Sequence, residues 1–449
     1  MSIEILEDST NLLSESPEYL RKVVIASAIG SFVEWYEFSI YGYLAVILGQ
    51  VFFANTAPHL QLVASLGAFA VAFLARPLGG VLFGWIGDNI GRKTALSLSL
   101  WLMAAATFCI GLLPSYTQIG FIAPLLLILL RLIQGLSAGG EVSGAAIFVA
   151  EHSQQHNRTF MTSLIEVGCI SGFLFGLMIT ALCFSVLSTE QMQEWGWRLP
   201  FFLAAPFSLI GIYIRRHLHE SDDFKKIKNE KKPEGNILCQ LAKVAPQLWQ
   251  SLGLIIVTNV TLFTVLTYIP ATIRKNMQQE GLISYWVSVF PTALLIFCIP
   301  LLALLAQKIS HKMIMMIGAI TIIIFAIPAF QLIDSSSIWL KIGGVSLLSL
   351  ALACFLSCIL AIIPSLFPAS IRYTAMAISY NIGVALFAGT APMLNAWLIN
   401  VTGDPLVPAY YLIIAALVGI WSIYSFKDSN QHYSSKISFN DEVASIDDR

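Results

Sequence analysis

Charged residues are scarce in this chain of 449 residues: Asp, Glu, Lys and Arg make up 11% of the sequence, and hydrophobic residues make up 57%. A soluble globular domain is about one quarter charged, so the composition argues against one. The net charge of −1 gives no electrostatic basis for binding nucleic acid. Long apolar runs recur instead, each able to cross about 30 Å of hydrocarbon. They are too uniformly apolar for the alternating strands of a barrel and therefore predict membrane-spanning helices.

Clusters that could hold a metal or perform catalysis are also lacking. The seven cysteines are scattered without a CxxC pair, and the seven histidines lie outside the deep parts of the apolar runs. Scattered cysteines in apolar runs are usually small apolar filler. We also find no nucleophile placed with a base near one end of the runs. The sequence therefore predicts no metal, no cofactor and no enzyme.

About twelve apolar runs divide into two groups of six. A polar stretch at 215–246 separates the groups, and Pro270, Pro364 and Pro392 are expected to bend their spans. The predicted fold is an all-α polytopic membrane protein with two pseudo-symmetric six-helix bundles. Its predicted segments are a tail at 1–21, a bundle at 22–214, a loop at 215–246, a bundle at 247–426 and a tail at 427–449. The predicted spans are 22–50, 60–86, 94–114, 119–150, 159–187, 197–214, 247–271, 284–305, 312–333, 337–366, 373–399 and 406–426.

Lysine and arginine gather in the loops on one side of these spans. That side carries Arg21, Lys22, Arg92, Lys93, Arg158, the stretch 215–246, Lys308, Lys312, Arg372 and Lys427. The other side carries Arg198, Arg274, Lys275 and Lys341. Because cytoplasmic loops are enriched in Lys and Arg, we expect the first side and both termini to be cytoplasmic. The polar, acidic segment 1–18 is not a signal peptide.

The loop after the second span reads Gly84-Trp-Ile-Gly87-Asp88-Asn-Ile-Gly91-Arg92-Lys93 and has a weaker counterpart at 303–312. Its glycines permit a tight turn, and Asp88 can accept hydrogen bonds from Arg92 or from a helix N-terminus. The counterpart has Gln307 and His311 in place of the acid and the arginine. We predict a cytoplasmic gate; the alternative is a plain turn with solvated charges. The predicted gate residues are Gly84, Asp88, Gly91, Arg92, Arg158 and Arg372.

Six charged residues fall inside the spans of the first half: Glu34, Glu37, Arg76, Arg131, Glu141 and Glu166. A charge at bilayer depth is costly, so it usually meets a partner or a transport pathway, and Arg131 needs an acid. Four carboxylates against two guanidiniums leave two negative charges to be neutralised by a proton or by a cationic substrate group. We predict that Glu34 or Glu37 carries a proton; structural ion pairs are the alternative for any one of them.

Aromatic and amide residues near these charges suggest how a substrate is held. Trp35, Tyr36, Tyr41 and Tyr380 could surround a quaternary ammonium by cation–π attraction, although core packing is the stronger alternative. Asn259 and Asn381 offer neutral hydrogen bonds from the second half. Excess carboxylate opposes a dicarboxylate substrate. The sequence favours a small zwitterion bound between the halves, moved by alternating access in a monomer.

Several strings carry a resemblance to a known family. GSFVEWYEFSIYG at 30–42, FLARPLGG at 73–80, the loop at 84–93, RLIQGLSAGGE at 131–141 and FPASIRYT at 367–374 resemble the metabolite:proton symporter family of the major facilitators. The resemblance covers about residues 20–426, and within the family the chain looks most like the bacterial proline/glycine-betaine transporters. It implies uptake of proline or glycine betaine through the bacterial inner membrane, energised by a proton gradient.

The resemblance leaves alternatives. The proline/glycine-betaine transporters that the chain resembles have an osmosensing coiled-coil tail, whereas segment 427–449 shows no heptad repeats. In addition, Glu37 stands where the family usually has Asp. Osmotic gating is therefore doubtful, and the substrate could have drifted. The other candidate functions are symport of an organic acid of the 2-oxoglutarate, citrate or shikimate type, and a membrane sensor that does not transport.

Overall fold

The computed structural model describes residues 17–216, 241–276, 283–368 and 371–425. In these ranges it is helical without strands, and twelve helices are long and apolar enough to cross a membrane. The predicted fold class is confirmed. Most of the predicted loop at 215–246, most of the predicted tail at 1–21 and all of the predicted tail at 427–449 lie outside the described residues.

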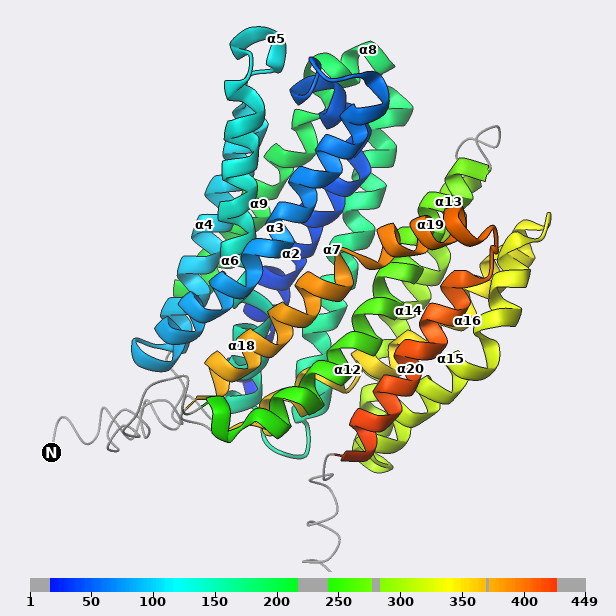
Figure 1. Ribbon diagram of the computed structural model, residues 1–449. Helices are drawn as coiled ribbons and strands as arrows, with labels where there is room; N and C mark the ends of the chain where they lie inside the picture. The colour runs from blue at the N-terminus through cyan, green and yellow to red at the C-terminus, as the bar shows by residue number, and fades with distance from the viewer. Residues whose placement is uncertain (1–16, 217–240, 277–282, 369–370, 426–449) are drawn as a thin grey trace, which may run out of the picture.

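The helices of the first half follow the predicted spans within a few residues. They are α2 (Pro17–Phe52), α3 (Pro58–Asn89), α4 (Arg92–Leu112), α6 (Ile122–His152), α7 (Arg158–Val186) and α9 (Arg198–Arg216). At one end of this bundle lie the short helices α5 (Tyr116–Ile119) and α8 (Thr189–Gln191) and the π-helical segment η1 (Met192–Gly196) (Figure 1). One prediction was wrong: Arg215 belongs to α9 and is buried, whereas we placed it in the polar loop.

Three spans of the second half are interrupted on the N-terminal side of a proline. The segment η2 (Thr264–Tyr268) precedes Pro270, a break at 357–358 precedes Pro364, and η3 (Val384–Ala388) precedes Pro392. Proline lacks an N–H and its ring clashes with the carbonyl four residues earlier, which favours the irregular turns before Pro270 and Pro392. The helices that contain Pro77, Pro206, Pro291, Pro300 and Pro328 nevertheless run on without a break. The helices are α12 (Ala245–Phe263), α13 (Ile269–Asn276), α14 (Ile283–Lys308), α15 (His311–Asp334), α16 (Ile338–Leu356), α17 (Ile359–Ser365), α18 (Arg372–Gly383), α19 (Ala391–Thr402) and α20 (Val407–Ser425).

Glycines bring α3 and α6 into backbone contact. A Cβ on Gly79 would overlap the carbonyl group of Leu136, and a Cβ on Gly135 would overlap that of Ala72. Small residues at such positions let membrane helices approach closely. The close crossing places Arg76 of α3 beside α6, in the interior of the bundle.

The two bundles stand side by side and meet mainly through α18, which packs against α3 and α6, and through α14, which packs against α7 (Figure 1). The end of the molecule where α3 ends and α4, α7 and α18 begin carries Arg92, Arg158 and Arg372, and we call it the basic end. The helices α5 and α8 lie at the opposite end. Every site described below is positioned by this junction or by the first bundle.

Candidate functional site

A buried charged triad joins the two bundles. Arg76 donates from Nη1 to Oε1 of Glu34 on α2 at 2.6 Å and from Nε to Oδ1 of Asn381 on α18 at 3.1 Å. Asn381 in turn donates to the carbonyl of Gly139 on α6 at 2.6 Å. All three side chains are buried. Two atoms of opposite charge, Glu34 Oε2 and Arg76 Nη2, have no hydrogen-bond partner among the described residues.

A second cluster lies around Glu37, entirely within the first bundle. Gln134 donates from Nε2 to Glu37 Oε2 at 3.2 Å and to Thr107 Oγ1 at 2.6 Å, and its Oε1 accepts from Arg131 Nη1 at 2.9 Å. Arg131 also lies over the ring of Tyr41, at 4.0 Å from its centroid. We predicted an acid partner for Arg131, but among the described residues its hydrogen-bond partner is the neutral Gln134. A glutamine can serve both groups because its amide carries an acceptor and a donor.

Glu141 is held by a guanidinium that the sequence analysis missed. Arg215 of α9 approaches both carboxylate oxygens of Glu141, one of them at 3.1 Å, and Ser99 donates to Oε2 at 2.8 Å. Arg215 also donates to the carbonyl of Leu96 at 2.5 Å. The pair ties α6 to α9 and α4, and the hydrogen-bond partners of Glu141 among the described residues all belong to the first bundle.

Glu166 stands apart from the other buried acids. It lies on α7, is 4% exposed, and has no ion pair or hydrogen bond within the part of the chain that the structure describes. It is within electrostatic range of Glu34. Apart from Arg92, which is buried at the basic end beside Asp88 and Glu151, the buried arginines of the first bundle are Arg76, Arg131 and Arg215. The four buried glutamates exceed these three by one negative charge, where the sequence analysis counted an excess of two.

The predicted aromatic cage is divided between two places. Tyr36 donates to the carbonyl of Pro200 at 2.7 Å and packs on Phe207, and Tyr41 donates to the carbonyl of Ser65 at 3.2 Å; both lie inside the first bundle. Trp35 instead faces the second bundle, with its ring centroid 5.9 Å from that of Phe263. A helix turns by about 100° per residue, which separates neighbouring side chains such as those of residues 35 and 36.

Two other predicted substrate residues, Tyr380 and Asn259, lie on helices of the second bundle. Tyr380 is buried on α18, within electrostatic range of Glu34, Arg76 and Glu166. Asn259 is buried on α12 and donates to the carbonyl of Ile255 in its own helix at 2.9 Å. The structure therefore brings Trp35 and Tyr380 to the junction and leaves Tyr36 and Tyr41 elsewhere.

The predicted gate residues meet at the basic end. Asp88 pairs with Arg92 through Oδ1, and its Oδ2 accepts from the backbone N–H of Thr374 at 3.0 Å and from the Thr374 hydroxyl at 2.6 Å. Glu151 lies 3.5 Å from Arg92 and 3.6 Å from Arg372. The first bundle thus binds the N-terminal turn of α18, where an aspartate is favoured by the free N–H groups.

Glycines of the motif permit this contact. Gly84 faces the backbone of Thr374, with a Cβ built on Gly84 lying 2.9 Å from its Cα, and Gly91 has a φ of 154°, which side chains rarely adopt. Tyr373 adds a hydrogen bond to the carbonyl of Gly140 at 2.7 Å. Arg158 starts α7 at the same end.

The weaker copy of the motif, in the second bundle, makes a corresponding contact with the first bundle. His311, at the start of α15, lies 2.6 Å from the hydroxyl of Thr159, at the start of α7, and is buried. Loop 84–93 of the first bundle therefore binds the start of α18, while the loop before α15 in the second bundle binds the start of α7. The two contacts are related as the pseudo-symmetry predicts.

The family models and relatives agree with this architecture. Residues 23–248 match the model described as "Sugar (and other) transporter", and residues 272–447 match that of the "Major Facilitator Superfamily". The "Proline/betaine transporter" of Salmonella typhimurium is 39% identical over 91% of this chain and 84% of its own length. The chain belongs to the major facilitator superfamily.

A further relative and a solved structure are also similar to this major facilitator. The "Glycine betaine/proline/ectoine/pipecolic acid transporter OusA" of Dickeya dadantii is 39% identical over 89% of this chain and 82% of its own length. The solved structure of the proton:xylose symporter XylE matches with a TM-score of 0.74 at 17% identity, covering 91% of this chain and 95% of that one. The predicted family, and the prediction of a membrane transporter that is not an enzyme, are confirmed.

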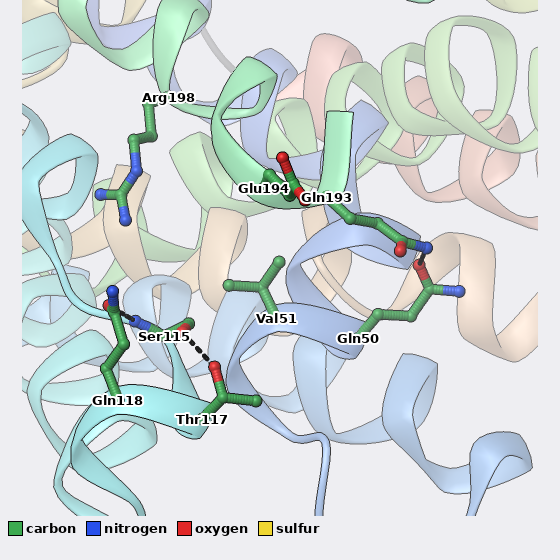
Figure 2. Close-up of a pocket in the computed structure, with 8 residues that line it drawn as sticks. All are labelled: Gln50, Val51, Ser115, Thr117, Gln118, Gln193, Glu194 and Arg198. Carbon is green, nitrogen blue, oxygen red and sulfur yellow. Dashed lines mark hydrogen bonds between the residues drawn. The ribbon is translucent and has the colours of Figure 1, made fainter. Parts of the chain in front are cut away.

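A pocket of about 390 Å³ opens on this major facilitator at the end opposite the basic end. Arg198 in its wall donates to the carbonyl of Gly111 at 2.6 Å, and Gln193 donates to Gln50 at 2.8 Å. Figure 2 shows Val51 between these side chains and those of the turn at 115–118. The pocket is formed by the first bundle alone and contains none of the buried glutamates, so we do not place the transport site there.

Proposed function

We propose that this transporter takes up a small zwitterion such as proline or glycine betaine together with protons, by alternating access. It works as a monomer in the bacterial inner membrane, with the basic end and both termini in the cytoplasm, and needs no cofactor besides the proton gradient. The names of the relatives support the substrate class. The bias of Lys and Arg toward the basic end supports the orientation.

The observation that carries the proposal is the pair of buried atoms in the triad at the junction. Glu34 Oε2 and Arg76 Nη2 have opposite charge and no partner among the described residues, at the place where α2, α3 and α18 meet. An unsatisfied buried polar atom costs about 1–3 kcal/mol, more when charged. A zwitterion with N–H groups, such as proline, presents an ammonium to the carboxylate and a carboxylate to the guanidinium, so it satisfies both atoms at once. Glycine betaine, which has no N–H, bonds the guanidinium and offers the Glu34 carboxylate its positive charge. An organic acid would satisfy only the guanidinium.

The excess carboxylate supplies a place for the coupling proton. One of the buried glutamates must be neutralised by a proton or by the substrate, because an unpaired charge at this depth is costly. Glu34 and Glu37 remain our proposed proton carriers. Glu37 suits the role because the neutral Gln134 stands between it and Arg131, so a change of its charge does not break an ion pair.

In our proposal the contacts between the two bundles at the basic end close the cytoplasmic gate. Opening that end requires the first bundle to release Thr374, Arg372 and Tyr373 of α18 from Asp88, Glu151 and Gly140. Substrate and proton would enter from the opposite side in this state and leave after the bundles rock against each other.

Replacing Asp88 by Asn is expected to weaken the closed gate. The amide loses the charge-assisted bonds to Arg92 and Thr374, so the populations should shift toward the state open at the basic end by about 10-fold or more. Spin-label distances across the basic end, measured in purified protein, would report the shift. Asn89→Ala is the matched control, because the Asn89 amide bonds the carbonyl of Trp85 in its own helix. Unchanged distances in D88N would contradict the role of Asp88 in the gate.

Uptake in cells that lack their own osmolyte carriers tests the proposed function. Radiolabelled proline, glycine betaine and 2-oxoglutarate are supplied with and without an inward proton gradient. We expect gradient-dependent uptake of proline or glycine betaine and none of 2-oxoglutarate. Uptake of 2-oxoglutarate alone would overturn the substrate class, and no transport of any solute by folded protein in the membrane would favour a sensor.

A further inference from the structure

We propose that Glu166 accepts hydrogen bonds from the N–H groups of the substrate ammonium. It thereby sets the preference of the transporter between substrates whose ammonium carries N–H groups and substrates whose ammonium is fully methylated. The proposal rests on the proposed transport of zwitterions and goes further, because it assigns the discrimination within that substrate class to one side chain. Glu166 would be a specificity-determining residue.

Burial without a partner is the first support. Glu166 is 4% exposed and makes no ion pair or hydrogen bond among the described residues, while Glu34, Glu37 and Glu141 each accept at least one. Buried polar groups are nearly always paired, and an exception calls for an explanation such as a ligand or a proton. The one excess negative charge of this set falls on Glu166 if the other three glutamates are assigned to Arg76, Arg131 and Arg215.

The position of Glu166 is the second support. It lies on α7 seven residues, or about two helical turns, before Phe173, so both project from the same face. The ring centroid of Phe173 is 6.1 Å from that of Trp35, which also contacts Phe263 of the second bundle. Tyr380 is buried on α18, one of the helices of the junction. The Glu166 carboxylate therefore lies on the face of α7 that carries Phe173, about two turns nearer the basic end.

The chemistry of the two substrate types then differs at this carboxylate. A secondary ammonium such as that of proline donates N–H bonds to a carboxylate, and charge-assisted bonds of this kind are about twice as strong as neutral ones. A quaternary ammonium has no N–H and is held by charge attraction and by aromatic faces such as those of Trp35 and Tyr380. Loss of the charge on Glu166 should thus cost the N–H donors more.

Transport of matched pairs of substrates tests the assignment. Proline is compared with proline betaine, and dimethylglycine with glycine betaine, by counterflow exchange in proteoliposomes, which does not depend on coupling. In Glu166→Gln we expect KM for proline to rise about 10-fold or more and KM for proline betaine to rise less than about 3-fold. Dimethylglycine should follow proline, and Glu166→Asp, which keeps the charge on a shorter side chain, should raise KM for the N–H donors selectively but by a smaller factor than Glu166→Gln.

Controls separate the failures of the two proposals. Glu190→Gln, on the exposed helix α8, should leave every KM unchanged. Equal changes for the members of each pair in E166Q would overturn the role of Glu166 and leave zwitterion transport intact. If the unsubstituted protein exchanges none of these solutes, the proposed function itself is overturned. Should E166Q not fold, the same comparison in E166D decides, because its shorter carboxylate weakens the N–H bonds selectively only if Glu166 makes them.

Discussion

Uphill accumulation is expected to disappear when Glu34 or Glu37 is replaced by glutamine, while exchange down a gradient survives. In E34Q this exchange should show a raised KM, because we propose that Glu34 also faces the substrate ammonium. Glutamine is close to glutamate in shape and cannot take up and release the coupling proton. A membrane potential of about 100 mV is worth about 2.3 kcal/mol per charge, which corresponds to about 50-fold accumulation for one proton per substrate. The accumulation ratio of the variants should fall to about one.

Proteoliposomes with an imposed proton gradient measure this ratio, and counterflow of labelled substrate measures exchange in the same preparation. Glu194→Gln, an exposed glutamate at the end opposite the gate, is the matched control and should accumulate normally. Normal uphill accumulation by both E34Q and E37Q would show that neither carries the coupling proton.

Replacing Arg215 by Ala should destabilise the protein by about 3–5 kcal/mol, because it leaves Glu141 buried without its counter-ion. Removing both charges, in the double variant E141M/R215M, should recover most of that loss. Ser99 keeps a partner in the double variant, since it also donates to the carbonyl of Leu96 at 3.0 Å. Thermal unfolding of the purified protein in detergent measures the three stabilities.

Arg216 provides the control for this series. It is the next residue along α9 and is exposed, so R216A should change the stability by no more than about 0.5 kcal/mol. An R215A variant as stable as R216A would show that the Glu141–Arg215 pair does not hold α9 in place.

The fold could be predicted because its signal is local. An apolar run indicates a membrane span without reference to its neighbours. The spacing of the short glycine-rich loop with Asp88 and Arg92 likewise indicates a tight connection between two spans. The partners of these residues are not local. Asp88 bonds Thr374, which lies 286 positions away, and only the folded chain brings them together.

The errors at the site have the same origin. Arg215 was assigned to a loop because a hydropathy profile ends a span at a charge, whereas its partner Glu141 lies 74 positions earlier and draws it into the bundle. Gln134 has no signal of its own, yet its two-sided amide decides that Arg131 and Glu37 do not bond directly. Side-chain direction around a helix likewise separated Tyr36 from Trp35.

Direct observation of proton movement tests the central claim, that zwitterion and proton move together. Proteoliposomes carrying a trapped pH-sensitive dye are given proline or glycine betaine outside, with no initial gradient. We expect substrate to drive protons inward and acidify the interior in the unsubstituted protein, and E37Q to show no acidification. Entry of labelled substrate without any proton movement would contradict the account.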